Sequence, residues 1–223
     1  MSTNPVAGAP IRIQQNFLAR HERRLLNWIC PRLPAWTTPD QLTALGFIGA
    51  MIVAAGYMLS WIDPEWLGLS LAGYIVNWFG DSLDGSLARW RRIERPNYGY
   101  FVDHSVDAVG TLLMVGAIGA SPYLRLDVAL MAVIGYFLLS IHTFLSAKIV
   151  GEFRLSYMAG GPTELRLMLM AMTIAMPIVG GGDIGRTNFS AFDLFALVIA
   201  SILVTIFVVQ SFTLARTLRA RGG

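Results

Sequence analysis

Six long apolar stretches occupy most of this 223-residue chain, and they limit its fold more than any other feature. Each is long enough to cross the hydrocarbon core of a bilayer as an α-helix, which takes roughly 17–25 residues. Hydrophobic residues make up 55% of the chain and charged residues only 14%, a composition that excludes an ordinary soluble domain. The sequence therefore predicts an all-α integral membrane protein with six transmembrane helices, at residues 42–61, 66–89, 99–120, 127–149, 163–180 and 193–215.

Residues 1–40 are predicted to form an N-terminal tail and an amphipathic helix, and residues 41–223 the six-helix transmembrane domain. The segment from Ile11 to Cys30 has helical periodicity, with arginines on one part of its surface. Its apolar side is formed by Phe17, Leu18, Leu25, Trp28 and Ile29. Such a helix lies at the cytoplasmic membrane interface or packs on the bundle as a lid, and periodicity does not distinguish the two. After it, Thr38 or Asp40 is expected to cap the first span.

The basic residues predict the orientation in the membrane, because arginine and lysine are retained on the cytoplasmic side. Of the 17 basic residues, only Arg125 and Arg186 fall on the side opposite the termini. Both termini are therefore expected in the cytoplasm, with the first span as the targeting element, since no secretory signal precedes it. The net charge of +3 flanks membrane spans, which favours membrane lipids over nucleic acid as the partner. The single Cys30 excludes an internal disulfide.

Four aspartates stand inside the second and third apolar stretches. Asp81 and Asp84 are three residues apart and Asp103 and Asp107 four apart, so each pair projects from one face of its own helix. Four carboxylates gathered in a low-dielectric setting repel one another and require a positive partner. Divalent cations with oxygen ligands are the usual partner, and magnesium is commonly shared with substrate phosphates. The sequence predicts a metal and phosphate site.

The depth of this site follows from the helix around the first pair. Asn77, Asp81, Asp84 and Ala88 form one stripe among mostly apolar residues, and such a stripe faces the interior of a bundle. Basic residues at 89–92 mark the cytoplasmic boundary. Because a helix rises 1.5 Å per residue, Asp81 is expected about 12 Å below that boundary. We expect a cavity that opens to the cytoplasm.

The same stretch carries eight fixed positions in the pattern Asp-x2-Asp-Gly-x2-Ala-Arg, a gap, then Gly-x3-Asp-x3-Asp. They are Asp81, Asp84, Gly85, Ala88, Arg89, Gly99, Asp103 and Asp107. This pattern resembles the signature of the CDP-alcohol phosphotransferases. The gap of nine residues is one longer than the commonest family spacing, and it falls in a charged loop containing Pro96, where length is tolerated.

The resemblance implies an enzyme that transfers a phosphate-linked group from a CDP-linked donor to a hydroxyl of a lipid or polar-alcohol acceptor and releases CMP. It implies Mg2+ or Mn2+, with two ions expected about 3.5–4 Å apart, and a homodimer. It assigns Asp81, Asp84, Asp103 and Asp107 as metal ligands, with Asp107 also a candidate base. Gly85 and Ala88 give the cytidine room, Arg89 orients the diphosphate, and Gly99 belongs to the substrate site.

A shorter match concerns the choice of base. Phe-x-Asp-His-x-x-Asp around His104, and Thr163-Glu164 further on, resemble the choline and ethanolamine phosphotransferase branch. In that branch a Glu and a His together deprotonate a diacylglycerol hydroxyl, which makes His104 and Glu164 a candidate catalytic dyad. The alternatives are a hydrogen-bonded bystander for His104 and a helix-start residue favoured by the dipole for Glu164.

Three functions are therefore compared. The favoured one transfers a phosphoalcohol headgroup from a CDP-alcohol to a diacylglycerol-like acceptor in phospholipid synthesis. Its rival moves phosphatidyl from CDP-diacylglycerol to a small polar alcohol such as glycerol phosphate, serine, inositol phosphate or choline. A membrane cation transporter is the third, but it predicts acidic residues across the whole membrane depth, whereas these four gather near one face.

Overall fold

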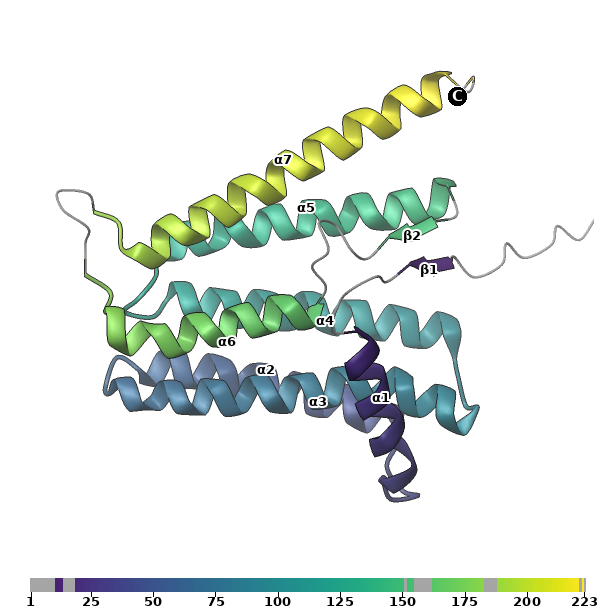
Figure 1. Ribbon diagram of the computed structural model, residues 1–223, viewed down its shortest axis with the longest axis horizontal. Helices are drawn as coiled ribbons and strands as arrows, with labels where there is room; N and C mark the ends of the chain where they lie inside the picture. Colours follow the sequence, from purple (N-terminus) through teal and green to yellow (C-terminus); the bar gives the residue numbers. More distant parts are fainter. Residues whose placement is uncertain are drawn as a thin grey trace, which may run out of the picture.

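The computed structural model describes residues 11–13, 19–150, 152–154, 162–182, 188–220 and 222. Six long helices lie side by side in this part of the chain, and a shorter one crosses them near one end (Figure 1). The helices are α1 (Ala19–Ile29), α2 (Pro39–Leu59), α3 (Leu67–Arg91), α4 (Pro96–Gly119), α5 (Leu126–Val150), α6 (Pro162–Val179) and α7 (Ala191–Ala220). Helices α2 to α7 fall on the six predicted apolar segments, so the helical prediction is confirmed.

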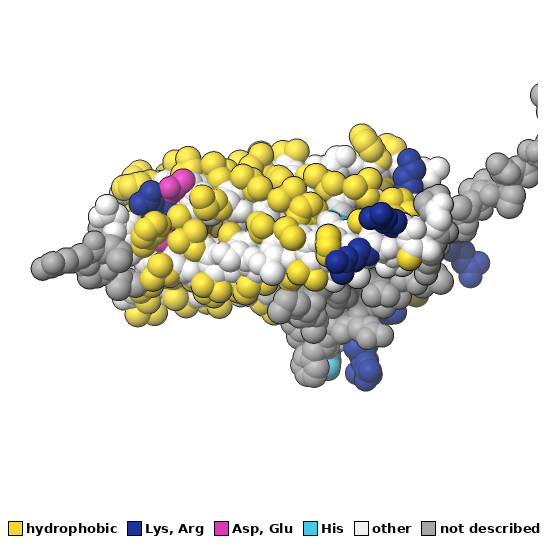
Figure 2. Space-filling model, turned by 90° about the horizontal axis from the view of Figure 1, so that it is seen from above, with side chains coloured by type: hydrophobic (Ala, Val, Ile, Leu, Met, Phe, Trp, Pro, Cys, Tyr) yellow, Lys and Arg dark blue, Asp and Glu magenta, His cyan; other side chains and the backbone are white. Residues whose placement is uncertain are grey.

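Four of these helices, α2, α4, α5 and α7, are long and apolar enough to cross a membrane. Apolar side chains cover much of the face in Figure 2, and most of its basic side chains gather toward one end. These features are those of an integral membrane protein. Helices α3 and α6 carry more charge, with Asp81 and Asp84 on the first and Glu164 and Arg166 on the second. Their crossing as two further spans stays a prediction.

The N-terminal segment differs from the prediction at its start. Ile11–Ile13 is a strand, β1, that pairs in parallel with β2, Glu152–Arg154. The prediction of a helix from Ile11 is therefore wrong for these three residues, where β-branched isoleucine favours the extended backbone. Helix α1 begins only at Ala19. Phe17 and Leu18 of the expected apolar face lie outside the described residues.

Helix α1 packs on the bundle through one edge. Leu26 and Cys30 are buried against leucines of α2 and α3. Leu25 and Trp28 lie within the same helix and remain 43% and 58% exposed. The helix thus makes the bundle contact expected of a lid and also presents a second apolar edge, whose contact with lipid stays a prediction.

The closest helix contact joins α2 and α3 through glycines. A Cβ atom on Gly80 would lie 2.2 Å from the backbone nitrogen of Gly46, and one on Gly49 would lie 2.3 Å from the backbone nitrogen of Asn77. No real Cβ approaches backbone so closely, so the two helices meet backbone to backbone at these points. This contact fixes the rotation of α3, and with it the direction of Asp81 and Asp84.

Thr38, one of the two predicted capping residues, caps the start of α2. The hydroxyl of Thr38 accepts from the Gln41 backbone N–H at 3.2 Å, and the Gln41 side chain accepts from the Thr38 N–H at 2.9 Å. This capping box satisfies two donors that the helix leaves open. Asp40, the other candidate, is ion-paired with Arg95 and so ties α2 to the loop before α4.

Replacement of Gly80 by alanine should destabilise the protein. The new methyl group would force α2 and α3 apart, and overpacking of this kind costs about 3 kcal/mol. Gly68→Ala in the same helix is the control, because a Cβ there meets nothing within 4 Å. Thermal unfolding in detergent should show a large loss for Gly80→Ala and none for Gly68→Ala. Equal unfolding temperatures for the two variants would contradict this packing.

Candidate active site

The α3 half of the site begins with Asp84, which is buried and anchored to α2. Its carboxylate accepts a hydrogen bond from the hydroxyl of Thr43 at 2.6 Å and another from the backbone N–H of Gly85. Thr43 lies one turn inside α2, on the helix that the glycine contact holds against α3. Asp84 is therefore held in one direction by two elements.

Asp81, one turn earlier, faces α6. Its carboxylate forms an ion pair with the guanidinium of Arg166, with Nη2 to Oδ2 at 2.9 Å. The Arg166 Nε donates to the side-chain oxygen of Asn77 at 3.0 Å, and the Asn77 amide donates to the Gly46 carbonyl at 3.0 Å. A chain of three contacts thus joins α6, α3 and α2 at the level of the aspartates.

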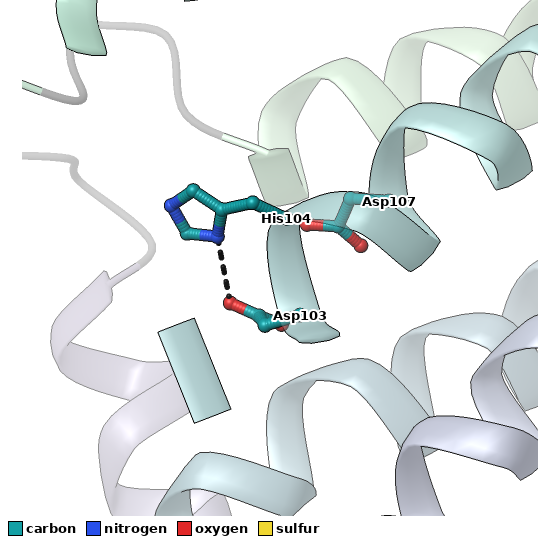
Figure 3. Close-up of side chains that lie close together, drawn as sticks. All are labelled: Asp103, His104 and Asp107. Atoms are coloured by element: carbon teal, nitrogen blue, oxygen red, sulfur yellow. Dashed lines mark hydrogen bonds and ion pairs between the residues drawn. The ribbon is translucent and has the colours of Figure 1, made fainter. Parts of the chain in front are cut away.

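The α4 half brings three side chains together. Ligand atoms of Asp103, His104 and Asp107 lie within 4.8 Å of one another, and Nδ1 of His104 is 3.1 Å from Oδ2 of Asp103 (Figure 3). The imidazole also stacks near Tyr100 and Phe144, with ring centroids 4.3 and 5.2 Å away. The carboxylate oxygens suit Mg2+ or Mn2+ by ligand type, whereas an imidazole is more usual on Zn2+ or Fe2+. The donor set therefore fits a divalent cation.

The two halves meet across α3 and α4. The carboxyl groups of Asp81 and Asp107 lie within hydrogen-bonding reach of each other, and Asp107 also interacts electrostatically with Asp103 and Arg166. Asp84 interacts in the same way with Asp103 and Asp81. Two carboxylates this close repel unless a proton or a cation lies between them. We call these four aspartates the acid cluster. That they hold a metal ion together, as their spacing predicted, stays a prediction.

Residues predicted to contact the nucleotide lie at the end of α3 and the start of α4. The guanidinium of Arg89 turns back over Gly85, where an added Cβ would lie 3.2 Å from its Nη1, and Nη2 donates to the Ser86 hydroxyl at 3.3 Å. Ala88 is half-buried one turn after Asp84. Gly99 is exposed, and a Cβ there would meet nothing within 4 Å, so packing among the described residues does not require glycine.

The predicted dyad is placed only in part. Glu164 lies half-buried in the first turn of α6, two residues before Arg166, so its helix faces the acid cluster. His104 Nδ1 lies 3.1 Å from Oδ2 of Asp103, its neighbour in the chain. The dyad therefore stays a prediction.

Glu22 of α1 is a residue that the sequence reasoning missed. Its carboxylate accepts three hydrogen bonds, from Trp78 Nε1 at 2.8 Å, Ser82 Oγ at 2.9 Å and Thr163 Oγ1 at 2.9 Å. It thereby ties α1 to both α3 and α6 beside the acid cluster. The available signal was an acidic residue within an otherwise basic helix, flanked by Arg20, Arg23 and Arg24.

Arg91 also does more than mark the membrane boundary. Its guanidinium donates to backbone carbonyls of the connection before α2, namely those of Leu33, Pro34, Ala35 and Thr37. These contacts fold the link between α1 and α2 onto the end of α3. A guanidinium has five N–H donors in a fixed fork, which suits such a cluster of carbonyls.

A groove of about 330 Å³ lies between α1, α3 and α6. Glu22 and Arg166 border it, and Ile75, Leu167 and Met170 supply an apolar wall. The groove therefore joins apolar surface to the basic side chain that contacts the acid cluster.

The family model described as CDP-alcohol phosphatidyltransferase matches residues 36–218. The matched segment runs from the turn before α2 into the last turns of α7 and includes all four aspartates. It leaves α1 outside. A search of the curated proteins finds no match.

Glu22→Ala should loosen α1 from the bundle. Loss of the carboxylate leaves three donors without their acceptor, and hydrogen bonds to a charged group contribute about 1.5–3 kcal/mol each. We expect a lower unfolding temperature for Glu22→Ala and a smaller loss for Glu22→Gln, which keeps an acceptor oxygen. Arg23→Ala, on the exposed side of α1, serves as the control. Unchanged unfolding of Glu22→Ala would contradict the anchoring role.

Proposed function

Because the chain belongs to the CDP-alcohol phosphatidyltransferase family, transferases of phospholipid synthesis that use CDP-alcohols, we propose a specific reaction for it. It transfers a phosphoalcohol headgroup from a CDP-alcohol to a diacylglycerol-like hydroxyl and releases CMP. The single observation that carries this proposal is the group formed by Asp103, His104 and Asp107 on α4, whose ligand atoms lie within 4.8 Å of one another. Membership of a transferase family leaves the cation-transporter alternative without support.

The acid cluster is proposed to hold Mg2+ or Mn2+, two ions in the working enzyme. Asp81, Asp84, Asp103 and Asp107 are the proposed ligands, supported by their mutual interactions and by the ligand spacing of the α4 group. When bound, the cation stabilises negative charge on the pyrophosphate and on the leaving CMP. The hydroxyl of Thr43 orients the carboxylate of Asp84 for this role.

The nucleotide is proposed to lie over the last turns of α3. Gly85 and Ala88 carry little or no side chain there, and Gly99 leaves open surface at the start of α4. Arg89, whose guanidinium already lies over Gly85, orients the diphosphate. A planar guanidinium matches phosphate oxygens in a bidentate way, which favours arginine over lysine in this role.

Removal of the acceptor proton is proposed for His104, together with Glu164. The contact of His104 Nδ1 with Asp103 supports this proposal, because a carboxylate beside one ring nitrogen favours the tautomer that is protonated there. A carboxylate beside imidazole also stabilises the imidazolium that forms when the proton arrives. Asp107 remains the other candidate base, but a bound cation lowers the basicity of a ligand carboxylate.

The lipid substrate is proposed to approach through the groove between α1, α3 and α6. Its apolar wall suits an acyl chain, and Arg166 at its border suits a phosphate. The distribution of basic residues supports six spans with both termini and the site on the cytoplasmic side. A homodimer, expected from the resemblance, is part of the same proposal.

Arg166 also favours the second candidate function. A guanidinium beside the acid cluster suits a phosphorylated acceptor such as glycerol phosphate or inositol phosphate, and diacylglycerol carries no phosphate. In that reaction phosphatidyl moves from CDP-diacylglycerol to the polar alcohol, and CMP again leaves.

A donor and acceptor panel separates the two reactions. Purified protein in lipid micelles with Mg2+ should release CMP from CDP-ethanolamine or CDP-choline only when diacylglycerol is present, and EDTA should abolish the release. Release from CDP-diacylglycerol with a polar alcohol would select the second reaction. No CMP from any pair would contradict both.

Substitution of the proposed dyad should slow turnover without loss of cation binding. His104→Ala and Glu164→Ala should each lower kcat by about 10²–10⁴-fold, the usual contribution of a general base. Asp107→Asn should lower both kcat and the affinity for Mn2+. Unchanged kcat in His104→Ala or Glu164→Ala, with Asp107→Asn inactive, would assign the base to Asp107 instead.

A further inference from the structure

One basic side chain stands inside the acid cluster. Arg166 is ion-paired with Asp81 at 2.9 Å, and both side chains are largely buried, 13% and 21% exposed. It also interacts electrostatically with Asp107. A guanidinium so enclosed contributes far more to its partner's energy than a surface ion pair would.

The guanidinium of Arg166 is oriented by Asn77, which has contacts of its own with α2. Its Nε donates to Asn77 at 3.0 Å, and the Asn77 amide donates to the Gly46 carbonyl at 3.0 Å. The Asn77 backbone is itself packed against Gly49, where an added Cβ would lie 2.3 Å from the Asn77 nitrogen. Arg166 is therefore fixed at one nitrogen while another holds Asp81.

The ion pair with Arg166 makes Asp81 less available than the other aspartates to bind a cation. The ligand atoms that lie within 4.8 Å of one another are those of Asp103, His104 and Asp107, while an Asp81 oxygen receives the guanidinium. An arginine and a divalent cation on the same carboxylate repel each other strongly at low dielectric. Coordination of a cation by Asp81 therefore requires that its ion pair with Arg166 break.

We propose that Arg166 is an internal counter-ion, which holds Asp81 in the cation-free protein and competes with the divalent cation for it. Cation binding displaces the guanidinium from Asp81, and the Asn77 contact favours its return when the cation leaves. This competition lowers the affinity of the site for the cation. In the cation-free protein, the guanidinium offsets the repulsion among the aspartates. The inference rests on the proposed function only for the identity of the cation site.

The test measures the Kd of Mn2+ by the EPR signal of free Mn2+, on full-length protein in detergent at one pH and ionic strength, without any nucleotide. Arg166→Gln should lower the Kd by at least about tenfold, because the competitor is gone. Asn77→Leu changes no charge and should also lower the Kd, because the anchor of the guanidinium is lost. Arg89→Gln is the matched control, since it removes a positive charge near the cluster and should change the Kd less than threefold.

Arg166→Lys covers the case in which Asn77→Leu does not fold. Lysine keeps the charge but cannot contact Asn77 and Asp81 as a fork, so its Kd should fall between those of wild type and Arg166→Gln. A Kd that is unchanged or raised in Arg166→Gln overturns the proposal, as does an equal effect in Arg89→Gln. The proposed function is tested separately: Mn2+ binding of the expected pattern without CMP release would refute only the reaction, and CMP release without this pattern would refute only the counter-ion.

Discussion

Repulsion among four aspartates that lie close together on two apolar helices is the constraint on which the rest of this structure depends. Three of the four carboxylates lie against a polar or basic side chain that offsets this repulsion. Asp84 accepts from the Thr43 hydroxyl, Asp103 lies against the His104 imidazole, and Asp81 is held by the Arg166 guanidinium. These partners come from three different helices besides α3. The acid cluster therefore determines which helices must surround it.

The same constraint explains why the supporting contacts are so close. A cluster of like charges stays together only if its helices cannot rotate or separate. The glycine contact between α2 and α3 fixes one pair of aspartates. Glu22 then ties α1 and α6 to that pair, and Arg91 folds the preceding link onto the same end. Rigid helices with a few polar contacts hold a site more accurately than loops would.

Local patterns were enough to predict the helices and the aspartate pairs. A helix repeats every 3.6 residues, so the spacing of Asp81 and Asp84 already put both on one face. The predicted helix 99–120 ends within one residue of the end of α4. Pairing between distant residues was not predictable. Arg166 and Asp81 are 85 positions apart, and only tertiary packing brings them together. Strand β1 has three residues, too few for a periodic signal.

Convergence of α3 and α4 on one cation can be measured directly by making the site bind a different metal. In a Cys30→Ala background, Asp81→Cys and Asp107→Cys would be combined and the Zn2+ affinity determined by calorimetry, since thiolates are preferred zinc ligands. The account predicts that the double variant binds Zn2+ at least about a hundredfold more tightly than either single variant, because two thiolates reach one ion. A double variant that binds no more tightly than the single ones would show that the two helices direct these side chains to different places.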